Sequence, residues 1–275
     1  KQSVIYEANL KLEQLPVYIQ KIETPKYYKG TIVYLSNTDI SNYYHWMCLT
    51  LPLLRFYDSY LGDRNEISYF YLGNGEIKQF HLETLQRAGI DSNKVITEAC
   101  EGDRIIGIVV NRKEFNGYAP ITYESYKFVR NLLLNQFSSD KNEGGKKRIY
   151  VKRGNVKRRK VINEEEILEI LKSYDFDVLD MDGKTLDEQI YLFSNAECII
   201  APHGAALTNL LFASEGTKVV EIFPFGYSHN CFYTLANYSG CVYYYLQGEN
   251  INGLNKEAEY GEGNNLDIYV DIEEF

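Results

Sequence analysis

The chain has 275 residues, 45% of them hydrophobic and 24% charged, with a formal net charge of −9. This length and composition support a large buried core and exclude an intrinsically disordered chain. No apolar run approaches the ~20 residues of a membrane-spanning helix, and the negative charge argues against non-specific nucleic-acid binding.

Apolar runs in the first half of the chain alternate with helical patterns. Buried strands are predicted at 31–36, 67–72 and 104–110, and helices at 42–60, 77–88 and 123–137. No pattern places the residues before about 29. A polar, glycine-containing stretch over 138–147 marks a domain boundary. We therefore expect an N-terminal domain over 1–142 and a C-terminal domain over 143–275.

The second half shows a clearer alternation of strands and helices. Strands are predicted at 148–152, 176–179, 197–201, 218–223 and 241–246. Helices are predicted at 163–174, 185–196, 205–213 and 227–238. Continuous apolar strands that alternate with helices predict a parallel sheet covered on both faces, which is the α/β class.

Two of these helices begin with the sequence of a capping box. Asn163 precedes Glu166 by three residues, and Thr185 precedes Glu188 by three. In such a box the first side chain accepts a backbone N–H of the first turn, and the second returns a hydrogen bond. Both sequences predict where their helices begin.

The cysteines are odd in number, widely spaced and without a C-x-x-C pair: Cys48, Cys100, Cys198, Cys231 and Cys241. We expect buried free thiols in a reducing compartment rather than disulfides or zinc ligands. The sequence predicts neither a metal site nor a cofactor.

A candidate anion site lies after the predicted strand at 197–201. Pro202, His203 and Gly204 follow the strand, and a helix begins at once with Ala205 and Ala206. The first N–H groups of a helix have no partner within the helix, and its dipole adds positive potential there, which suits a phosphate. The alternative is a tight turn with a core histidine, but the small neighbouring residues favour an anion site.

A basic run over 146–160 holds nine Lys or Arg and no acid. Arg153 lies at the carboxyl end of the strand predicted at 148–152, the edge of an open parallel sheet where ligands bind. Arg153 and Arg158 are therefore candidates to bind phosphate oxygens. The alternative is a solvated basic loop, which we favour for Lys157, Arg159 and Lys160.

Glu221 lies within the apolar run of a predicted strand. An ionisable group there is costly without a partner, so we interpret Glu221 as a candidate to accept the two hydroxyls of a ribose. The alternative is an acid at the surface or at the start of a helix.

His45 is the candidate base of the first half. Ser41 or Asn42 can cap the helix there, which places His45 in the first turn, where the helix N-terminus keeps an imidazole neutral. A structural histidine in an aromatic cluster with Trp46 is an equally good interpretation. Asp180 and Asp182 form a D-x-D triplet of the kind that binds a divalent metal in some sugar transferases.

These motifs together resemble glycosyltransferase family 61. The resemblance is strong over 148–245 and rests on matches in four stretches of the family pattern: Arg153, Arg158, Val161, Asn163 and Glu164; Glu188 and Gln189; His203, Gly204, Ala205, Leu207 and Asn209; Glu221 and Pro224. His45 and Trp46 resemble the upstream histidine motif of the family. The sequence contains no G-x-G-x-x-G dinucleotide motif and no P-loop.

The resemblance implies a GT-B fold, in which two Rossmann-like parallel-sheet domains face a cleft. It also implies an inverting transfer from a UDP-sugar, such as UDP-xylose or UDP-N-acetylglucosamine, to a glycan acceptor, with no required metal. This chain looks like a short member of the family that works in polysaccharide biosynthesis in the cytoplasm. An N-terminal anchor could have been removed.

These expectations assign a role to each candidate residue. The donor diphosphate is expected at Ala205 and Ala206, with Gly204 beside it, and the base is expected to be His45. The other donor-binding candidates are Arg153, Arg158, Gln189, His203, Asn209 and Glu221, and the alternative bases are Asp39 and Asp58. Gln189 and Asn209 could instead only orient loops.

Two other classes of function compete with this one. A non-catalytic protein could bind polyanions or nucleic acid through 146–160, but that leaves His203 and Glu221 without a role. A metal-dependent GT-A transferase could use Asp180 and Asp182.

Overall fold

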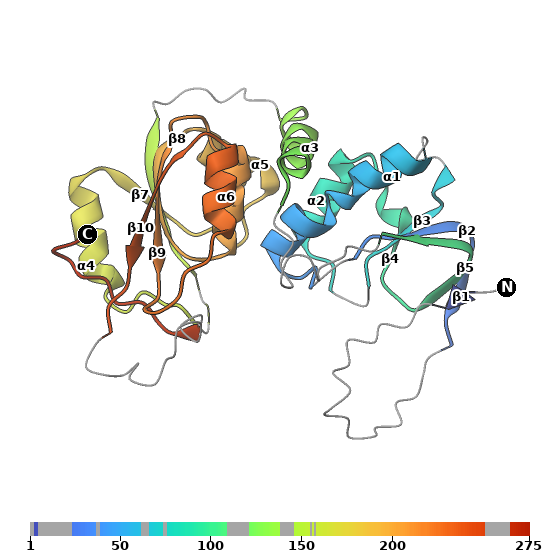
Figure 1. The fold of residues 1–275 in the computed structure, drawn as a ribbon, viewed down its shortest axis with the longest axis horizontal. Coiled ribbons are helices and arrows are strands. Elements are labelled where there is room, and N and C mark those ends of the chain that lie inside the picture. The colour runs from blue at the N-terminus through green and yellow to red at the C-terminus, as the bar shows by residue number, and fades with distance from the viewer. Residues whose placement is uncertain are drawn as a thin grey trace, which may run out of the picture. The chain divides into compact units, whose positions relative to one another are not determined.

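The computed structural model describes residues 3–4, 24–36, 39–61, 66–73, 76–108, 121–137, 146–154, 156, 158–250 and 265–275. The chain divides into two compact units, Lys1–Ala119 and Pro120–Phe275 (Figure 1). Each unit is described below by itself. Both contain a sheet with parallel strands and covering helices, which confirms the α/β class and agrees with the expected pair of Rossmann-like domains.

The sheet of the first unit has the strand order β1-β5-β2-β3-β4. Its strands are β1 (Ser3–Val4), β2 (Lys26–Tyr34), β3 (Tyr69–Tyr71), β4 (Val95–Ile96) and β5 (Cys100–Gly107). All neighbours are parallel except β1 and β5. The three strands predicted from apolar runs correspond to β2, β3 and β5. The other two strands have two residues each, too few to show a period in the sequence.

The helices of this unit lie on one face of its sheet in Figure 1. The helix predicted over 42–60 is divided into the π-helix η1 (His45–Thr50) and α1 (Leu53–Leu61). Leu51 donates its N–H to the Trp46 carbonyl, five residues back, at 2.8 Å. Pro52 follows and has no N–H to continue a regular helical ladder, so the helix is divided there. The remaining helices are α2 (Gln79–Arg87) and the 3-10 helix η3 (Ser92–Lys94).

The sheet of the second unit is parallel throughout, with the order β10-β9-β8-β6-β7. Its strands are β6 (Lys147–Val151), β7 (Phe176–Leu179), β8 (Ala196–Pro202), β9 (Lys218–Phe223) and β10 (Val242–Gln247). All five were predicted. The chain places β7 on one side of β6 and then returns to place β8 on the other side. This reversal of strand order creates a switch point between β6 and β8, and open α/β sheets bind ligands at the carboxyl ends of the strands at such a point.

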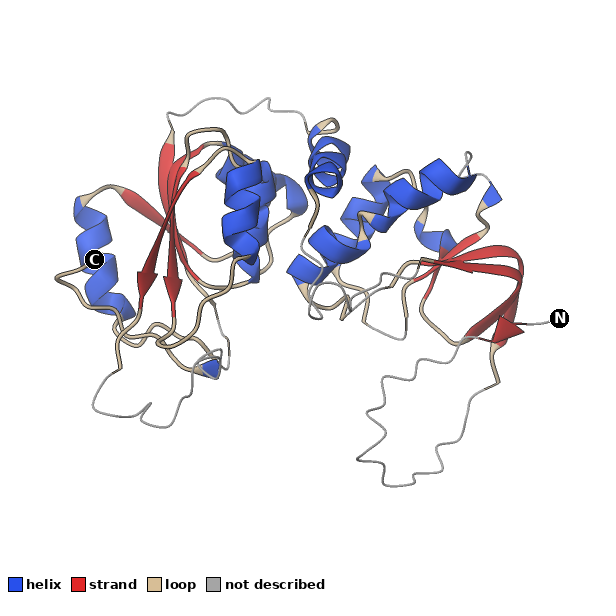
Figure 2. Ribbon diagram, in the orientation of Figure 1, coloured by secondary structure: helices blue, strands red, loops and turns tan. Residues whose placement is uncertain are grey.

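Helices cover both faces of this sheet, as Figure 2 shows. Helix α4 (Glu164–Ser173) lies on one face, where Ile167 and Leu171 join a buried cluster with Tyr150 of β6. Helix α5 (Leu186–Ser194), the 3-10 helix η5 (Ala205–Phe212) and α6 (Cys231–Tyr238) lie on the other face. The sequence therefore predicted the number of layers correctly, although η5 is a tighter helix than the α-helix expected over 205–213.

Only one of the two predicted capping boxes forms. Thr185 and Glu188 form the box as predicted, with each side chain bonded to the other's backbone N–H. Asn163 is the N-cap of α4, as predicted, but the predicted box does not form, because its side chain makes no cap hydrogen bond. Its amide instead pairs with the backbone of Val270, donating to the carbonyl at 2.9 Å and accepting the N–H at 3.1 Å. Val270 is fully buried, so this pairing satisfies a backbone that water cannot reach.

The boundary between the units lies before helix α3 (Tyr123–Leu134), which contacts η5 and α6. The division expected from the sequence falls after this helix, within residues that lie outside the described ranges. The roles assigned to the two domains stay predictions.

All five cysteines are free thiols, as expected; Cys48 and Cys100 are buried and the others are half-buried. In the described part of the chain, no helix has the length and apolar character needed to cross a membrane.

Candidate functional site

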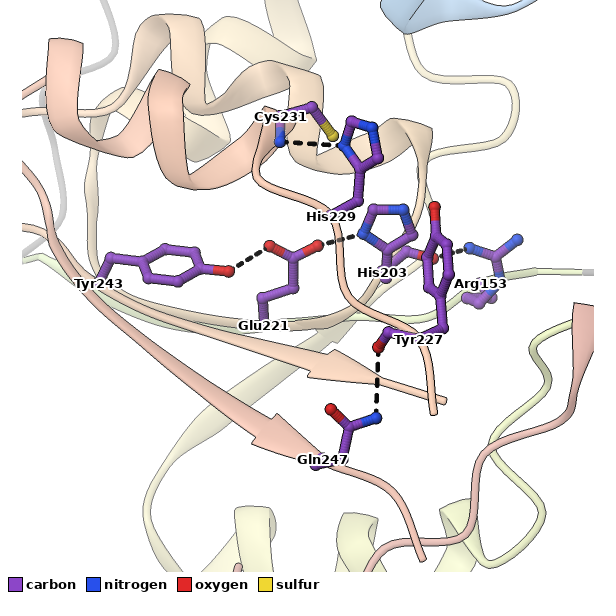
Figure 3. A network of polar contacts seen from close by, with 8 residues as sticks. All are labelled: Arg153, His203, Glu221, Tyr227, His229, Cys231, Tyr243 and Gln247. Carbon is purple, nitrogen blue, oxygen red and sulfur yellow. Dashed lines mark hydrogen bonds and ion pairs between the residues drawn. The ribbon is translucent and has the colours of Figure 1, made fainter. Parts of the chain in front are cut away.

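The switch point brings together Arg153, which follows β6, and His203, which follows β8. The Arg153 guanidinium donates a hydrogen bond from Nη1 to the carbonyl oxygen of His203 (Figure 3). Gly204 permits this approach, since a Cβ on Gly204 would collide with the same Nη1 atom. The prediction that Arg153 and His203 share one edge of the sheet is confirmed.

A second guanidinium, that of Arg159, belongs to the same cluster. Arg159 is half-buried, and its backbone has a φ of 60°, a left-handed conformation that costs an L-residue roughly 1–2 kcal/mol. Its charge and that of Arg153 both lower the pKa of His203, so both cations lie near this imidazole. The interpretation of Arg159 as part of a solvated loop is therefore wrong.

Both guanidinium groups have an unsatisfied donor. The Nε atoms of Arg153 and Arg159 are buried and have no hydrogen-bond partner among the described residues. Burial, together with the charges of Arg159 and Arg158, lowers the pKa of Arg153 to about 10. A buried N–H without an acceptor costs roughly 1–3 kcal/mol. This cost would be relieved by an anion that accepts from both side chains.

Arg158, predicted to bind phosphate, is exposed, and its Nη1 donates to Oδ1 of Asn265 at 2.7 Å. Ion pairs occupy other cations of the basic run: Lys147 with Asp177 at 2.7 Å and Arg148 with Glu197 at 2.7 Å. These pairs reduce the positive surface that a polyanion would need.

His203 and Glu221 form a buried pair. The Nδ1 atom of His203 contacts Oε1 of Glu221, and the Tyr243 hydroxyl donates to Oε2 at 2.5 Å. Glu221 has an exposed fraction of 0% and His203 of 5%. Both carboxylate oxygens are thus engaged, so a ribose could bind Glu221 only by displacing a side chain. The ribose role stays a prediction, and the geometry favours Glu221 as the residue that holds His203.

Burial shifts the proton affinities of this pair in opposite directions. It raises the pKa of the Glu221 carboxyl to about 8, since a charged carboxylate is disfavoured away from water. Burial, together with the charges of Arg159 and Arg153, lowers the pKa of His203 to about 3. The His203 ring therefore does not carry a positive charge independently of Glu221.

Aromatic rings enclose the His203 imidazole. Phe223 stacks on it with ring centroids 5.1 Å apart, and the rings of Tyr227 and Phe232 lie at 5.3 and 5.2 Å. His229 lies at 6.4 Å, and its Nδ1 accepts the backbone N–H of Cys231 at 3.2 Å (Figure 3). This wall holds the imidazole in one orientation and keeps water from it.

Helix η5 begins at the predicted point. Gly204 is its N-cap in an extended conformation, and Ala205 is exposed, whereas Ala206 is half-buried. The start of the helix therefore lies next to the Arg153 guanidinium, which Gly204 contacts. The diphosphate role of this helix start stays a prediction.

Gln189 and Asn209 contact each other rather than open space. The Asn209 amide donates to Oε1 of Gln189 at 2.7 Å, and the Gln189 amide donates to the Lys184 carbonyl at 3.0 Å. Asn209 is fully buried. These contacts favour the interpretation that the two amides orient loops.

His45 in the first unit is half-buried and begins helix η1. Asn42 caps the turn before it, since its Oδ1 accepts the N–H groups of Tyr44 at 2.9 Å and His45 at 3.3 Å. Nδ1 of His45 lies 3.2 Å from the carbonyl oxygen of Asp39. If Nδ1 donates its proton there, Nε2 is left able to accept one. This geometry is compatible with a base.

The two alternative bases are less suitable. Asp39 accepts the Ser41 hydroxyl at 2.5 Å and the Ser41 N–H at 2.9 Å. These hydrogen bonds lower its pKa, with the hydroxyl contributing most, which weakens it as a base. Asp58 is half-buried on α1. The choice among the three residues stays a prediction.

Asp180 and Asp182 lie against Gly154, whose φ is +64°. A Cβ on Gly154 would come within 3.0 Å of Asp182 and 3.2 Å of Asp180. Asp180 also lines a pocket of about 400 Å³ with Lys152, Arg153, Gly154, Lys160, Val161 and Glu164. Within the described ranges, no group of three or more His, Cys, Asp or Glu side chains could hold a metal ion.

Comparison with known proteins agrees with the resemblance found in the sequence. The family model described as Glycosyltransferase 61 matches residues 43–220. The bovine (Bos taurus) EGF domain-specific O-linked N-acetylglucosamine transferase is 30% identical over 106 residues, 37% of this chain and 20% of that protein. The protein O-linked-mannose beta-1,4-N-acetylglucosaminyltransferase 2 of Xenopus laevis and that of Mus musculus are each 29% identical over 99 residues, 34% of this chain and 17% of theirs. The matched region thus spans a fifth or less of each relative.

Proposed function

Because the chain belongs to glycosyltransferase family 61, we propose that it transfers a sugar from a UDP-sugar to a hydroxyl of a glycan acceptor, with inversion at the anomeric carbon. The relatives that it matches are named as N-acetylglucosamine transferases. UDP-N-acetylglucosamine is therefore the first donor to test, and UDP-xylose is the second.

The observation that carries this proposal is the pair of half-buried arginines near His203, each with a buried Nε that has no partner among the described residues. Arg153 lies beside the start of helix η5, where its Nη1 donates to the His203 carbonyl. A nucleoside diphosphate offers the oxygens and the negative charge that these groups lack. Phosphates also favour the start of a helix.

The proposed reaction is a single displacement. The acceptor oxygen forms a bond to the anomeric carbon on the face opposite the diphosphate. The bond from that carbon to the phosphate oxygen breaks, and its electrons pass to the diphosphate. Arg153 and Arg159 stabilise the departing charge, while His45 takes the proton of the acceptor hydroxyl.

UDP is expected to raise the melting temperature of the protein in proportion to the logarithm of its concentration above its dissociation constant. A ligand that binds only the folded state stabilises it by about 2.7 kcal/mol at a hundredfold excess over that constant. Differential scanning fluorimetry with UDP, UMP and ADP measures the effect. UMP, with one phosphate, should shift the melting temperature less than UDP. The absence of a shift with any nucleoside diphosphate at millimolar concentration would remove this proposal.

Sugar transfer is expected to survive EDTA, because the two guanidinium groups and the helix start supply the positive potential that a metal supplies elsewhere. The measurement is release of UDP with and without EDTA and with added Mn²⁺. The same measurement is made on Asp182→Ala, which removes one carboxylate of the D-x-D triplet. Loss of activity in EDTA, its rescue by Mn²⁺, and loss in Asp182→Ala would together favour the GT-A alternative.

A further inference from the structure

We propose that Glu221 and Tyr243 are positioning residues that keep a hydrogen on Nε2 of His203, so that this imidazole acts as a hydrogen-bond donor to the donor diphosphate. The inference rests on the proposed function, since it assigns His203 a role at the same anion site. It also gives the buried carboxylate a role other than binding ribose.

The contacts fix the orientation of the Glu221 carboxyl group. Tyr243 lies on β10, next to β9, and its hydroxyl donates to Oε2 at 2.5 Å. The other oxygen, Oε1, faces Nδ1 of His203. The remaining ring nitrogen, Nε2, lies on the edge of the imidazole away from Glu221, toward the side where Tyr227 and Arg153 stand (Figure 3).

The number of protons on the pair decides what Nε2 can do. When the Glu221 carboxyl group and the His203 ring together hold two dissociable protons, one lies between Glu221 and Nδ1 and the other lies on Nε2. This holds whether the pair is a neutral acid with a neutral imidazole or a carboxylate with an imidazolium. With one proton, the carboxylate retains the Nδ1 hydrogen and Nε2 becomes an acceptor. An acceptor would repel a phosphate oxygen, so binding needs the two-proton state.

The surroundings favour the two-proton state at neutral pH. Burial raises the pKa of Glu221 to about 8, while the hydroxyl of Tyr243 opposes that shift. The ionisable groups that face the pair come from helix α6, strand β10 and two loops: Arg153, Arg159, Tyr227, His229, Cys231 and Tyr243. Arg153, whose pKa is lowered to about 10, stays mostly charged up to about pH 9, so the change in binding below that pH is assigned chiefly to the pair.

The variant Glu221→Gln tests the inference, because its amide is oriented by the same two neighbours. Tyr243 donates to the amide oxygen, and the amide NH₂ then faces His203 and donates to Nδ1. This arrangement keeps the hydrogen on Nε2 and has no carboxyl to lose a proton. The control is Glu197→Gln, which removes an exposed carboxylate near the opposite end of the same sheet.

UDP affinity is measured by calorimetry from about pH 7 to about pH 9, above the second pKa of a phosphate group and below the range in which the uracil N–H loses its proton. In the unaltered protein and in Glu197→Gln, affinity should fall by up to roughly tenfold over this range as the Nε2 hydrogen is lost, within the effect of one hydrogen bond to a charged group. In Glu221→Gln, affinity should stay constant over the same range. A Glu221→Gln profile that falls with that of the unaltered protein would overturn the inference.

A second variant, Tyr243→Phe, keeps the carboxyl group and serves if Glu221→Gln does not fold. Without the hydroxyl that stabilises the carboxylate, the fall in affinity should move to higher pH, and an unchanged midpoint would contradict the inference. Failure of the proposed function is distinct from both results, because the unaltered protein would then bind UDP at no pH.

Discussion

Replacing Arg153 with alanine is expected to lower turnover by about two to three powers of ten, the usual effect of removing one donor that stabilises developing negative charge. Arg153 is half-buried, and its buried Nε has no partner among the described residues. Its attraction for the diphosphate should grow as the sugar–phosphate bond breaks. The effect should therefore fall on turnover more than on the Michaelis constant.

The matched control is Arg148→Ala, because Arg148 lies near the start of β6, the strand that Arg153 follows. Arg148 forms an exposed ion pair with Glu197 and a hydrogen bond to the Tyr174 carbonyl. Turnover of this variant should stay within about twofold, as expected for an exposed pair worth under 1 kcal/mol. Melting temperatures of both variants check that the fold is intact. Near-normal turnover in a folded Arg153→Ala protein would remove Arg153 from the mechanism.

Replacing His45 with alanine is expected to lower turnover by about two to four powers of ten, the range for general base catalysis. UDP affinity should stay nearly unchanged, because the proposed diphosphate site belongs to the second unit. Turnover should recover partly at high pH, where the acceptor hydroxyl needs less help to lose its proton. The measurements are single-turnover rates against pH, UDP affinity and melting temperature on the same variant.

A purely structural role for His45 predicts a different set of results. Trp46 beside it is fully buried, and its indole N–H donates to Thr84 at 2.8 Å, so disturbing this helix should lower stability. Activity per folded molecule would then be preserved. A stable His45→Ala protein with near-normal turnover would move the search to Asp39→Asn and Asp58→Asn.

The second unit could be predicted well because its signals are local. The apolar strands are long, and the capping box of Thr185 and Glu188 lies within one helical turn. The meeting of Arg153 and His203 followed from a topological rule, since both residues end parallel strands of one sheet. Asn163 shows the limit of such reasoning, because its partner Val270 is 107 residues away.

The residues that the sequence analysis missed depend on tertiary structure. Arg159 joins the site through a left-handed backbone conformation that no pattern in a basic run indicates. Tyr243 reaches Glu221 diagonally between β10 and β9, although the register places Tyr245 opposite Glu221 and Tyr243 opposite Val219. Three adjacent tyrosines in the sequence leave open which one contacts the carboxyl group. In the first unit, Pro52 was a visible signal that the helix predicted over 42–60 would be divided.

The position of the anion site also bears on how the second unit folds. Strands β6 and β8 are neighbours in the sheet, but α4, β7 and α5 separate them in the sequence, and the two residues that meet there, Arg153 and His203, are 50 apart. The local β6–α4–β7 unit can form before β8 arrives, since short loops close at lower entropic cost. Arg153 and His203 can meet to form the anion site only once β8 has paired with β6. Nucleotide binding should thus report the pairing of β6 with β8, and a collapsed intermediate with the correct helices but without this pairing should bind none.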